Sequence, residues 1–364
     1  MANLRIPGPT PLPPSVQNAL ARPMINHRGA EFKQLFKGLL SDLKTVFQTQ
    51  NDVLILGASG TGGMEAALVN VISPGDGVLA VTVGYFGDRF ATIAEVCGAH
   101  VHRLEFPWGT PADPQIVGSY LVEHPGTRAV LVTHNETSTG VINDVQAIAA
   151  AIRAAGEPSP LLIVDGISSV GAIDLPADAW GCDMVVTCSQ KALMSPPGIS
   201  MLSVSPRAWE VVEGLPCRSY YFDLRALRKA AKEGETPATP PVSDLFALRE
   251  GVNLLLAEGL PNSFARHRRV GAKMRAGVAA LGLELLADPQ RASDTVTAIK
   301  MPDSLPADAI RTKLREEYGI VLAGGQGALK GKLIRVGHMG YVTEADVEAV
   351  LSAMRVVIQT YGTV

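Results

Sequence analysis

Between residues 53 and 204, short apolar runs alternate with longer segments of helical periodicity. Apolar runs of this length are typical of strands buried on both faces of a sheet. They occur at residues 53–56, 78–83, 129–133, 161–164, 184–187 and 200–204. Segments with the apolar spacing of helices include 31–48, 63–71, 89–97 and 145–155. This alternation predicts an α/β fold with βαβ crossovers around a mostly parallel sheet.

The pattern changes after the last of these strands. A charged stretch, Arg225 to Glu235, is predicted to be a loop. A smaller α/β unit is expected after it, with helices at 243–281 (interrupted near Gly259), 307–318 and after a cap at Thr343, a strand at 296–300 and two strands around a glycine-rich loop.

These patterns predict three parts. The prolines between Pro7 and Pro14 predict an N-terminal extended arm, since proline disfavours helix, and such an arm would have little to pack against in a monomer. The predicted parts are an arm over residues 1–25, a large domain over 26–245 and a small C-terminal domain over 246–364.

Composition and charge restrict the classes of protein. The 364 residues are 47% hydrophobic, enough for a full core, and 32 basic against 35 acidic residues form no block of like charge. We therefore expect no nucleic-acid or membrane partner, and no apolar run approaches the ~18 residues of a membrane span. The four cysteines form no CxxC pair and are expected in buried segments, which predicts no metal site, no disulfides and a cytoplasmic location.

A glycine-rich turn, residues 57–63 (GASGTGG), joins an apolar run to a helical segment. Small residues and a helix N-terminus suit a phosphate group, although a simple tight turn is an equally good interpretation. A dinucleotide site needs an acidic residue about 20 positions further on, but the next strand ends Val81-Thr82-Val83-Gly84. A P-loop needs Gly-Lys-Ser/Thr, which is also absent from the sequence.

Two charged residues follow predicted strands. Asp165 ends the run 161–164, and Lys191 comes shortly after the run 184–187. Each alone is most often a cap or a solvated loop residue, but the carboxyl ends of parallel strands share the edge where α/β sheets bind ligands. Pyridoxal phosphate needs this set: a helix N-terminus for its phosphate, a lysine for a Schiff base and a carboxylate that keeps the pyridine nitrogen protonated.

From Pro7 to Gly340 the chain resembles the class V, fold-type I pyridoxal-phosphate enzymes, and among them the alanine/serine–glyoxylate aminotransferase family. The motifs that carry the resemblance are Ser59-Gly60-Thr61-Gly62, residues 134–140 (HNETSTG), residues 164–169 (VDGISS), Gly181-Cys182-Asp183, residues 189–193 (SQKAL) and Arg335-Val336-Gly337-His338. The resemblance implies a large domain with a mostly parallel seven-stranded sheet sandwiched by helices, and a smaller C-terminal α/β domain.

The resemblance also implies roles for matching residues. Lys191 would hold the cofactor and move a proton at the substrate Cα, and Asp165 would bind the pyridine nitrogen. Arg335 would bind the substrate α-carboxylate through its bidentate fork. The other cofactor contacts would be Phe86 and Ile167 on the ring faces, Thr137 near the ring hydroxyl, Ser59, Gly60, Thr61, Gly62 and Gln190 around the phosphate, and Thr239 reaching the phosphate of the neighbouring subunit.

The chain departs from the family pattern at two places. Family members often carry a tyrosine just before the residue matching Thr239, where this chain has Glu235-Thr236-Pro237-Ala238, and the residue matching Phe86 is often Trp. His27 and Arg28 are candidates for contacts between subunits. Outside the motifs, Phe86 and Ile167 would be ordinary core residues, and Arg335 could pair with a structural carboxylate.

The implied reaction is a ping-pong transamination from alanine or serine to glyoxylate, giving glycine and pyruvate or hydroxypyruvate, in a homodimer whose active sites are shared across the interface. Aspartate or ureidoglycine as donor fits the same residues. A cysteine desulfurase or related lyase would need a nucleophilic cysteine before Arg335, and residues 323–332 contain none. A non-catalytic homologue would be expected to lose Lys191, Asp165 or Arg335.

Overall fold

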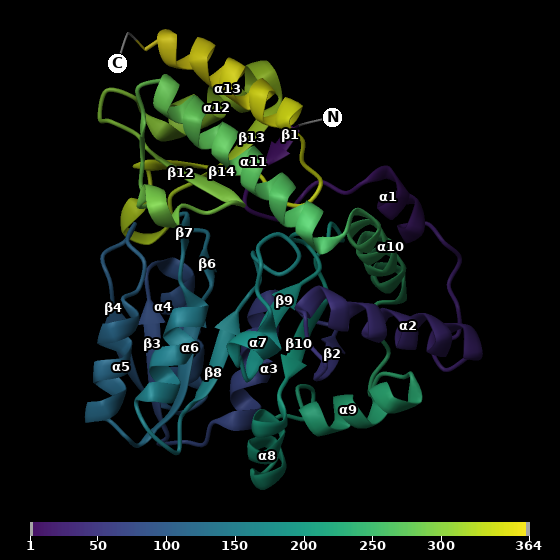
Figure 1. Cartoon of the computed structure of the whole chain (residues 1–364). Helices are drawn as coiled ribbons and strands as arrows, with labels where there is room; N and C mark the ends of the chain where they lie inside the picture. The colour runs from purple at the N-terminus through teal and green to yellow at the C-terminus, as the bar shows by residue number, and fades with distance from the viewer. Residues whose placement is uncertain (1–2, 362–364) are drawn as a thin grey trace.

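A computed structural model describes residues 3–361, in which a seven-stranded sheet forms the larger layer (Figure 1). Its strand order is β2-β10-β9-β8-β5-β3-β4, and only β10 runs antiparallel to its neighbours. The mostly parallel sheet is therefore confirmed. The strands are β2 (Asp52–Leu56), β3 (Gly77–Thr82), β4 (His100–Glu105), β5 (Thr127–Thr133), β8 (Leu161–Asp165), β9 (Met184–Cys188) and β10 (Ser200–Val204).

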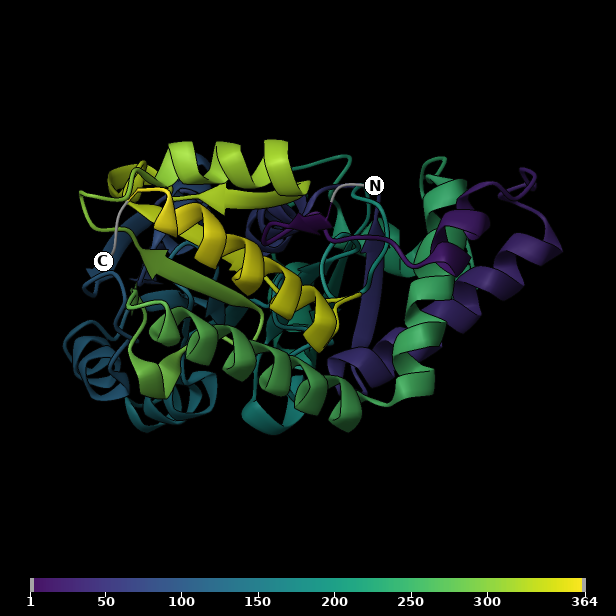
Figure 2. The same ribbon diagram turned by 90° about the horizontal axis from the view of Figure 1, so that it is seen from above.

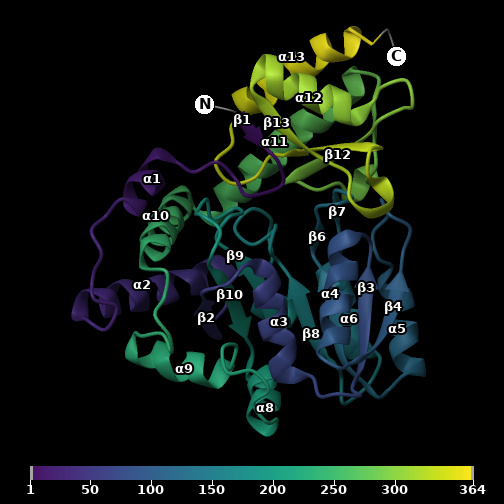
Figure 3. The same cartoon turned by 180° about the vertical axis from the view of Figure 1, so that it is seen from behind.

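Successive side chains of each strand enter two different cores. In β5, Val130 and Val132 pack in one core, and Ala129 and Leu131 pack in the other. Helices must therefore cover both faces of the sheet, as Figures 1 and 3 show from opposite sides. The first face carries α2 (Ala30–Phe47), α5 (Pro114–Glu123), α6 (Val145–Ala154), α7 (Ala177–Trp180) and α10 (Val242–Glu258). The second carries α3 (Gly60–Val71), α4 (Tyr85–Val96), α8 (Pro206–Gly214) and α9 (Leu224–Glu233).

Two parts of this layer differ from the sequence predictions. Strand β4 was missed because it lies at the sheet edge, where none of its side chains is fully buried. The stretch predicted as a charged loop is the helix α9, in which Leu224 and Leu227 are buried. These two apolar positions lie on one face among many charged residues, which hid the pattern.

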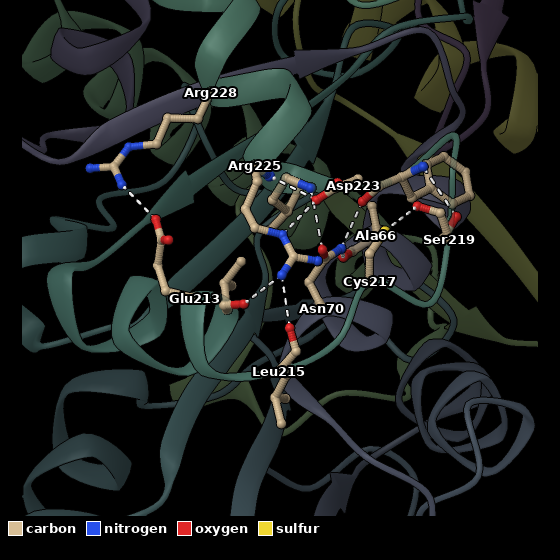
Figure 4. A network of polar contacts seen from close by, with 12 residues as sticks. Ala66, Asn70, Glu213, Leu215, Cys217, Ser219, Asp223, Arg225 and Arg228 are labelled. Carbon is tan, nitrogen blue, oxygen red and sulfur yellow. Dashed lines mark hydrogen bonds and ion pairs between the residues drawn. The ribbon is translucent and has the colours of Figure 1, made fainter.

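Hydrogen bonds anchor the segment before α9 at both ends (Figure 4). The Asp223 carboxylate caps the helix by accepting from Arg225 N at 3.0 Å, and the Arg225 guanidinium donates to Leu215 O at 2.8 Å. Asn70 on α3 donates through Nδ2 to Phe222 O at 2.7 Å. The loop between α8 and α9 is therefore held against α3, the helix that begins at the glycine-rich turn.

A second sheet of five strands lies beyond the carboxyl ends of the parallel strands, with order β1-β13-β14-β12-β11. Three long helices cover its outer face (Figure 2). The elements are β1 (Asn3–Arg5), β11 (Glu284–Leu285), β12 (Val296–Lys300), β13 (Ile320–Gly324), β14 (Leu333–Gly337), α11 (Leu260–Ala280), α12 (Ala307–Tyr318) and α13 (Glu344–Gln359). A small hairpin, β6 (Asn135–Glu136) and β7 (Val141–Ile142), lies between the two layers.

Residues 7–13 contain no helix, as predicted for the proline-rich stretch, but the arm over residues 1–25 also holds a strand and a helix. The N-terminal segment pairs in parallel with β13 through β1, Arg5 binds the Asp346 carboxylate at 2.6 Å, and the helix α1 (Pro14–Leu20) packs on α10. The arm thus has extensive contacts within its own chain. Proline did not exclude this helix because Pro14 takes its first position, where the missing amide hydrogen has no helical partner to lose.

The long helical segment divides at Gly259 as predicted, since this residue has φ +83° between α10 and α11. Buried residues of α10 as far as Leu255 pack in the core of the seven-stranded sheet. The predicted boundary at residue 245 therefore falls inside a helix of that layer, and the division into domains there stays a prediction. Within residues 3–361, no helix is both long and apolar enough to cross a membrane.

The cysteines follow the expectation in three of four positions. Cys97, Cys182 and Cys188 are buried, and all four cysteines are free thiols. Cys217 is exposed, because it lies in the connection between α8 and α9 rather than in a strand or core helix.

Candidate active site

A cavity of about 270 Å³ lies at the carboxyl ends of β8 and β9, beneath the loop between β13 and β14. This is where parallel sheets place their ligand sites. Nine of the residues expected around the cofactor line it: Ser59, Gly60, Thr61, Phe86, Thr137, Asp165, Ile167, Gln190 and Lys191. Residues more than a hundred positions apart thus meet at one place, although their individual roles stay predictions.

Lys191 reaches the cavity from the loop that follows β9. Its Nζ donates to the Pro7 carbonyl, and Thr10 binds the same loop through Oγ1 to Lys191 O at 2.9 Å. Burial lowers the pKa of the Lys191 amine from its ordinary value, the neighbouring Arg335 lowers it further, and Asp165 opposes the shift. A lowered pKa favours the neutral amine, which is the nucleophilic form.

Asp165 is the last residue of β8, and only 5% of it is exposed. Its Oδ1 accepts a hydrogen bond from Ile167 N at 2.9 Å. Burial raises the pKa of this carboxyl to about 7 against the effect of that bond. The carboxylate is therefore costly to keep charged until a cation lies beside it.

The glycine-rich turn brings the first turn of α3 to the cavity. Ser59 is the N-cap, and its Oγ accepts from Gly62 N at 3.3 Å. A Cβ on Gly60 would lie 2.6 Å from Cδ1 of Ile167, and one on Gly63 would lie 2.0 Å from Oγ of Ser200. Only glycine at these positions lets α3 pack this closely on the sheet. The amides in the first turn of α3 then lie at the cavity, where they can bind an anion.

Phe86 is held by the buried carboxylate of Glu136, a residue of the 134–140 motif for which no role was predicted. Glu136 is fully buried, and its Oε2 accepts from Phe86 N and Gly87 N, each at 3.0 Å. Its Oε1 accepts from Ser138 N at 3.0 Å. Glu136 therefore caps the start of α4 from another part of the chain and sets the position of Phe86.

Arg335 lies on β14 beside the cavity and is 6% exposed. It donates through Nη1 to Thr137 O at 3.0 Å and through Nε to Gly324 O at 2.7 Å. It forms no ion pair with a carboxylate among residues 3–361. Burial lowers the pKa of its guanidinium to about 10, so it stays a cation at neutral pH.

Two expected cofactor residues lie elsewhere. Gly62 does not line the cavity and serves in the cap of α3. Thr239 is exposed and lines a separate pocket with Gly57, Tyr220 and Tyr221. Arg28 binds Glu235 and the Thr236 carbonyl in the segment that leads to Thr239.

Other lining residues had no role assigned from the sequence. They are Gly8, Met64, Arg89, Asn135, Ser168, Cys188 and Gln326. A signal was available for Arg89, because it follows Phe86 by three residues on one helix and such residues share a face. Gly8 carried no comparable signal, since only the folded chain brings the N-terminal segment to Lys191.

The residues present fit pyridoxal phosphate. Three cavity-lining residues have a buried side-chain oxygen without a hydrogen-bond partner in the described part of the chain, namely Oε1 of Gln190, Oδ1 of Asn135 and Oε1 of Gln326. With them are an amine of lowered pKa, a desolvated carboxylate and a helix N-terminus. On an α/β fold of this topology, this set defines a pyridoxal-phosphate enzyme of fold type I.

Comparison with known proteins identifies the family. The family model described as aminotransferase class-V matches residues 15–350, and the chain belongs to this family. The protein is therefore an aminotransferase, and pyridoxal phosphate is the cofactor that its family uses.

Relatives with nearly full-length similarity carry different names. The soluble hydrogenase small subunit of Synechococcus is 43% identical over 99% of this chain and 94% of its own. The L-aspartate–glyoxylate aminotransferase of Paracoccus denitrificans is 38% identical over 98% and 91% of the two chains. The serine–glyoxylate aminotransferase of Methylorubrum extorquens is 39% identical over 94% and 87%.

Solved structures share the whole fold. The alanine–glyoxylate aminotransferase of Nostoc superimposes with a TM-score of 0.94 at 32% identity, covering 98% of this chain and 95% of its own. The ureidoglycine–glyoxylate aminotransferase of Bacillus subtilis has a TM-score of 0.93 at 33% identity, covering 99% and 94%. These likenesses confirm the fold predicted from the sequence.

Proposed function

We propose that this protein transfers the amino group of alanine or serine to glyoxylate, giving glycine and pyruvate or hydroxypyruvate, in two half-reactions at one site. The observation that carries the proposal is Arg335, a buried guanidinium near Lys191 that donates to the carbonyl of the cavity-lining Thr137 and has no carboxylate partner among residues 3–361. Such a group suits the single carboxylate of a small amino acid or a 2-oxo acid.

When bound, pyridoxal phosphate supplies an aldehyde that condenses with amines and a ring that accepts the electron pair released at the substrate Cα. In our proposal, Lys191 holds the cofactor and later moves the proton at Cα, which its lowered pKa supports. Asp165 keeps the ring nitrogen protonated, and Phe86 and Ile167 contact the ring faces. Ser59, Gly60, Thr61 and Gln190 bind the phosphate, and Thr137 binds near the ring hydroxyl.

Arg335 orients the substrate in this scheme. Its hydrogen bonds to the Thr137 and Gly324 carbonyls hold the guanidinium plane, which reduces the entropy lost when a carboxylate binds. The orientation it imposes decides which Cα bond is broken.

A second candidate donor is aspartate. A second arginine, Arg89, lines the cavity and could take an additional carboxylate, and the Paracoccus relative is named for aspartate. The same reaction on glyoxylate would then give oxaloacetate and glycine.

We also infer a homodimer with active sites shared across the interface. Thr239 supports this, because it is exposed and lies in a pocket separate from the cavity of its own chain. Light scattering with the purified protein tests the assembly, and a monomer that is fully active would contradict it.

The reaction is tested by absorbance of the cofactor-loaded protein. L-alanine, L-serine and L-aspartate are added in turn, followed by glyoxylate, and glycine is measured by chromatography. We expect the visible band to fall with alanine or serine and to return with glyoxylate. A fall with aspartate alone would favour the second candidate, and no fall with any donor would refute both. Lys191→Ala is the control, because it should abolish the band of the loaded protein.

A further inference from the structure

Arg89 lies in the cavity without an assigned role. It sits on α4 one turn after Phe86, and its guanidinium carbon lies 5.0 Å from the Phe86 ring centroid and 5.2 Å from that of Tyr85. These rings hold the guanidinium from one side by cation–π contact. Its polar contact within residues 3–361 is from Nη1 to Oγ1 of Thr61, at 3.5 Å. The arginine therefore points at the glycine-rich turn.

The charge of Arg89 is balanced only in part, by Asp165, which lines the same cavity and whose pKa Arg89 lowers from a distance. Arg89 forms no ion pair with Asp or Glu in the described part of the chain, although Arg103, which packs on the same helix, binds Asp88 and Glu95. Among the cavity-lining residues, the cations are Arg89 and Lys191, and the acid is Asp165. An arginine that lines a cavity with no carboxylate at ion-pair distance among residues 3–361 indicates a place for an anionic ligand.

The predicted phosphate turn needs such a charge. A phosphate monoester carries a charge of about −1.5 to −2 at neutral pH, and a helix N-terminus offers only about +0.5. Residues 57–63 contain no lysine or arginine, and the chain lacks the tyrosine that family members often carry before Thr239. Lys191 is occupied by the aldehyde in the proposed reaction. Neutral donors alone would then hold a dianion.

We propose that Arg89 binds the phosphate group of pyridoxal phosphate, together with the turn at Thr61. The guanidinium balances the part of the phosphate charge that the N-terminus of α3 does not balance. Arg89 also contacts Phe86, so the residue expected on the ring face is packed against the residue that binds the phosphate. This assignment leaves Arg335 as the arginine for substrate carboxylates, which supports a donor with one carboxylate. It does not depend on which donor is used.

The test compares pyridoxal phosphate with pyridoxal, which lacks the phosphate. Both are titrated by absorbance into the full-length protein freed of cofactor, for the native chain, Arg89→Gln and Arg89→Lys. Hydrogen bonds to a charged group are worth about 1.5–3 kcal/mol, so Arg89→Gln should weaken pyridoxal phosphate about 10- to 100-fold. In Arg89→Gln, the affinity for pyridoxal should change less than about twofold. Arg89→Lys keeps the positive charge, so it should recover part of the lost affinity for pyridoxal phosphate and part of the salt dependence of that affinity.

Arg103→Gln is the matched control, because it removes an arginine packed on the same helix outside the cavity and should leave both affinities unchanged. Circular dichroism checks that each variant is folded. An equal loss for both ligands would overturn the proposal and assign Arg89 to ring positioning. Unchanged affinities with a raised KM for aspartate would also overturn it, and would assign Arg89 to a substrate carboxylate. Transaminase failure with intact pyridoxal phosphate binding would affect only the proposed function.

Discussion

Asp165→Asn should stabilise the cofactor-free protein, and the gain should depend on pH. Burial raises the pKa of Asp165 from 3.8 to about 7, so the folded state holds this proton more tightly than the unfolded chain. The associated stability is fully present below pH 3.8 and is lost as the pH rises through about 7. A difference of about three pKa units at 1.36 kcal/mol each gives a loss of about 4 kcal/mol. Asparagine carries no charge and keeps an oxygen for the Ile167 amide, so it avoids this loss.

The assay is urea unfolding of the cofactor-free protein between pH 5 and 8. The free energy of unfolding of Asp165→Asn should exceed that of the native protein by an amount that grows with pH, up to about 4 kcal/mol at pH 8. Asp303→Asn, at an exposed position, is the control and should show a small difference at every pH. A gap that stays constant with pH, or a less stable Asp165→Asn, would refute the reasoning. Added pyridoxal phosphate should reverse the order, because in the proposed binding mode its ring would give the native carboxylate a cationic partner.

Three further predictions concern the N-terminal segment at Lys191, the substrate and the fold. Gly8→Ala adds a Cβ 2.5 Å from Nζ of Lys191 at φ +130°, so cofactor incorporation should slow at least several-fold, whereas Gly75→Ala, which shares a positive φ in open space, should incorporate it normally. Arg335→Lys should raise the KM for the amino donor about tenfold with unchanged cofactor affinity, because lysine loses the bidentate fork; an unchanged KM would contradict the assignment. Thr343→Ala removes the capping box of α13 and should lower the free energy of unfolding by about 1 kcal/mol in urea, with unchanged kinetics.

The local pattern was sufficient for most of the sheet and helices. Strands such as β5 and β8 are continuous apolar runs because both their faces are buried, and an apolar run can be recognised directly in the sequence. Edge and surface elements were harder: β4 has no fully buried side chain, and α9 has two buried leucines among charged residues. Their apolar signal is weak because most of their side chains face water.

The sequence by itself determined the α/β class and the family resemblance, and it predicted that Lys191 and Asp165 meet at one edge of the sheet. These follow from short-range order, since a charged residue just after a buried strand must lie at the sheet edge. Only the tertiary structure decided that Pro7 and Gly8 close over Lys191, that Glu136 holds Phe86, and that Arg89 faces the glycine-rich turn. Such contacts join segments that are distant along the chain, and no local pattern records them, because they arise when the packing of layers sets which loops meet.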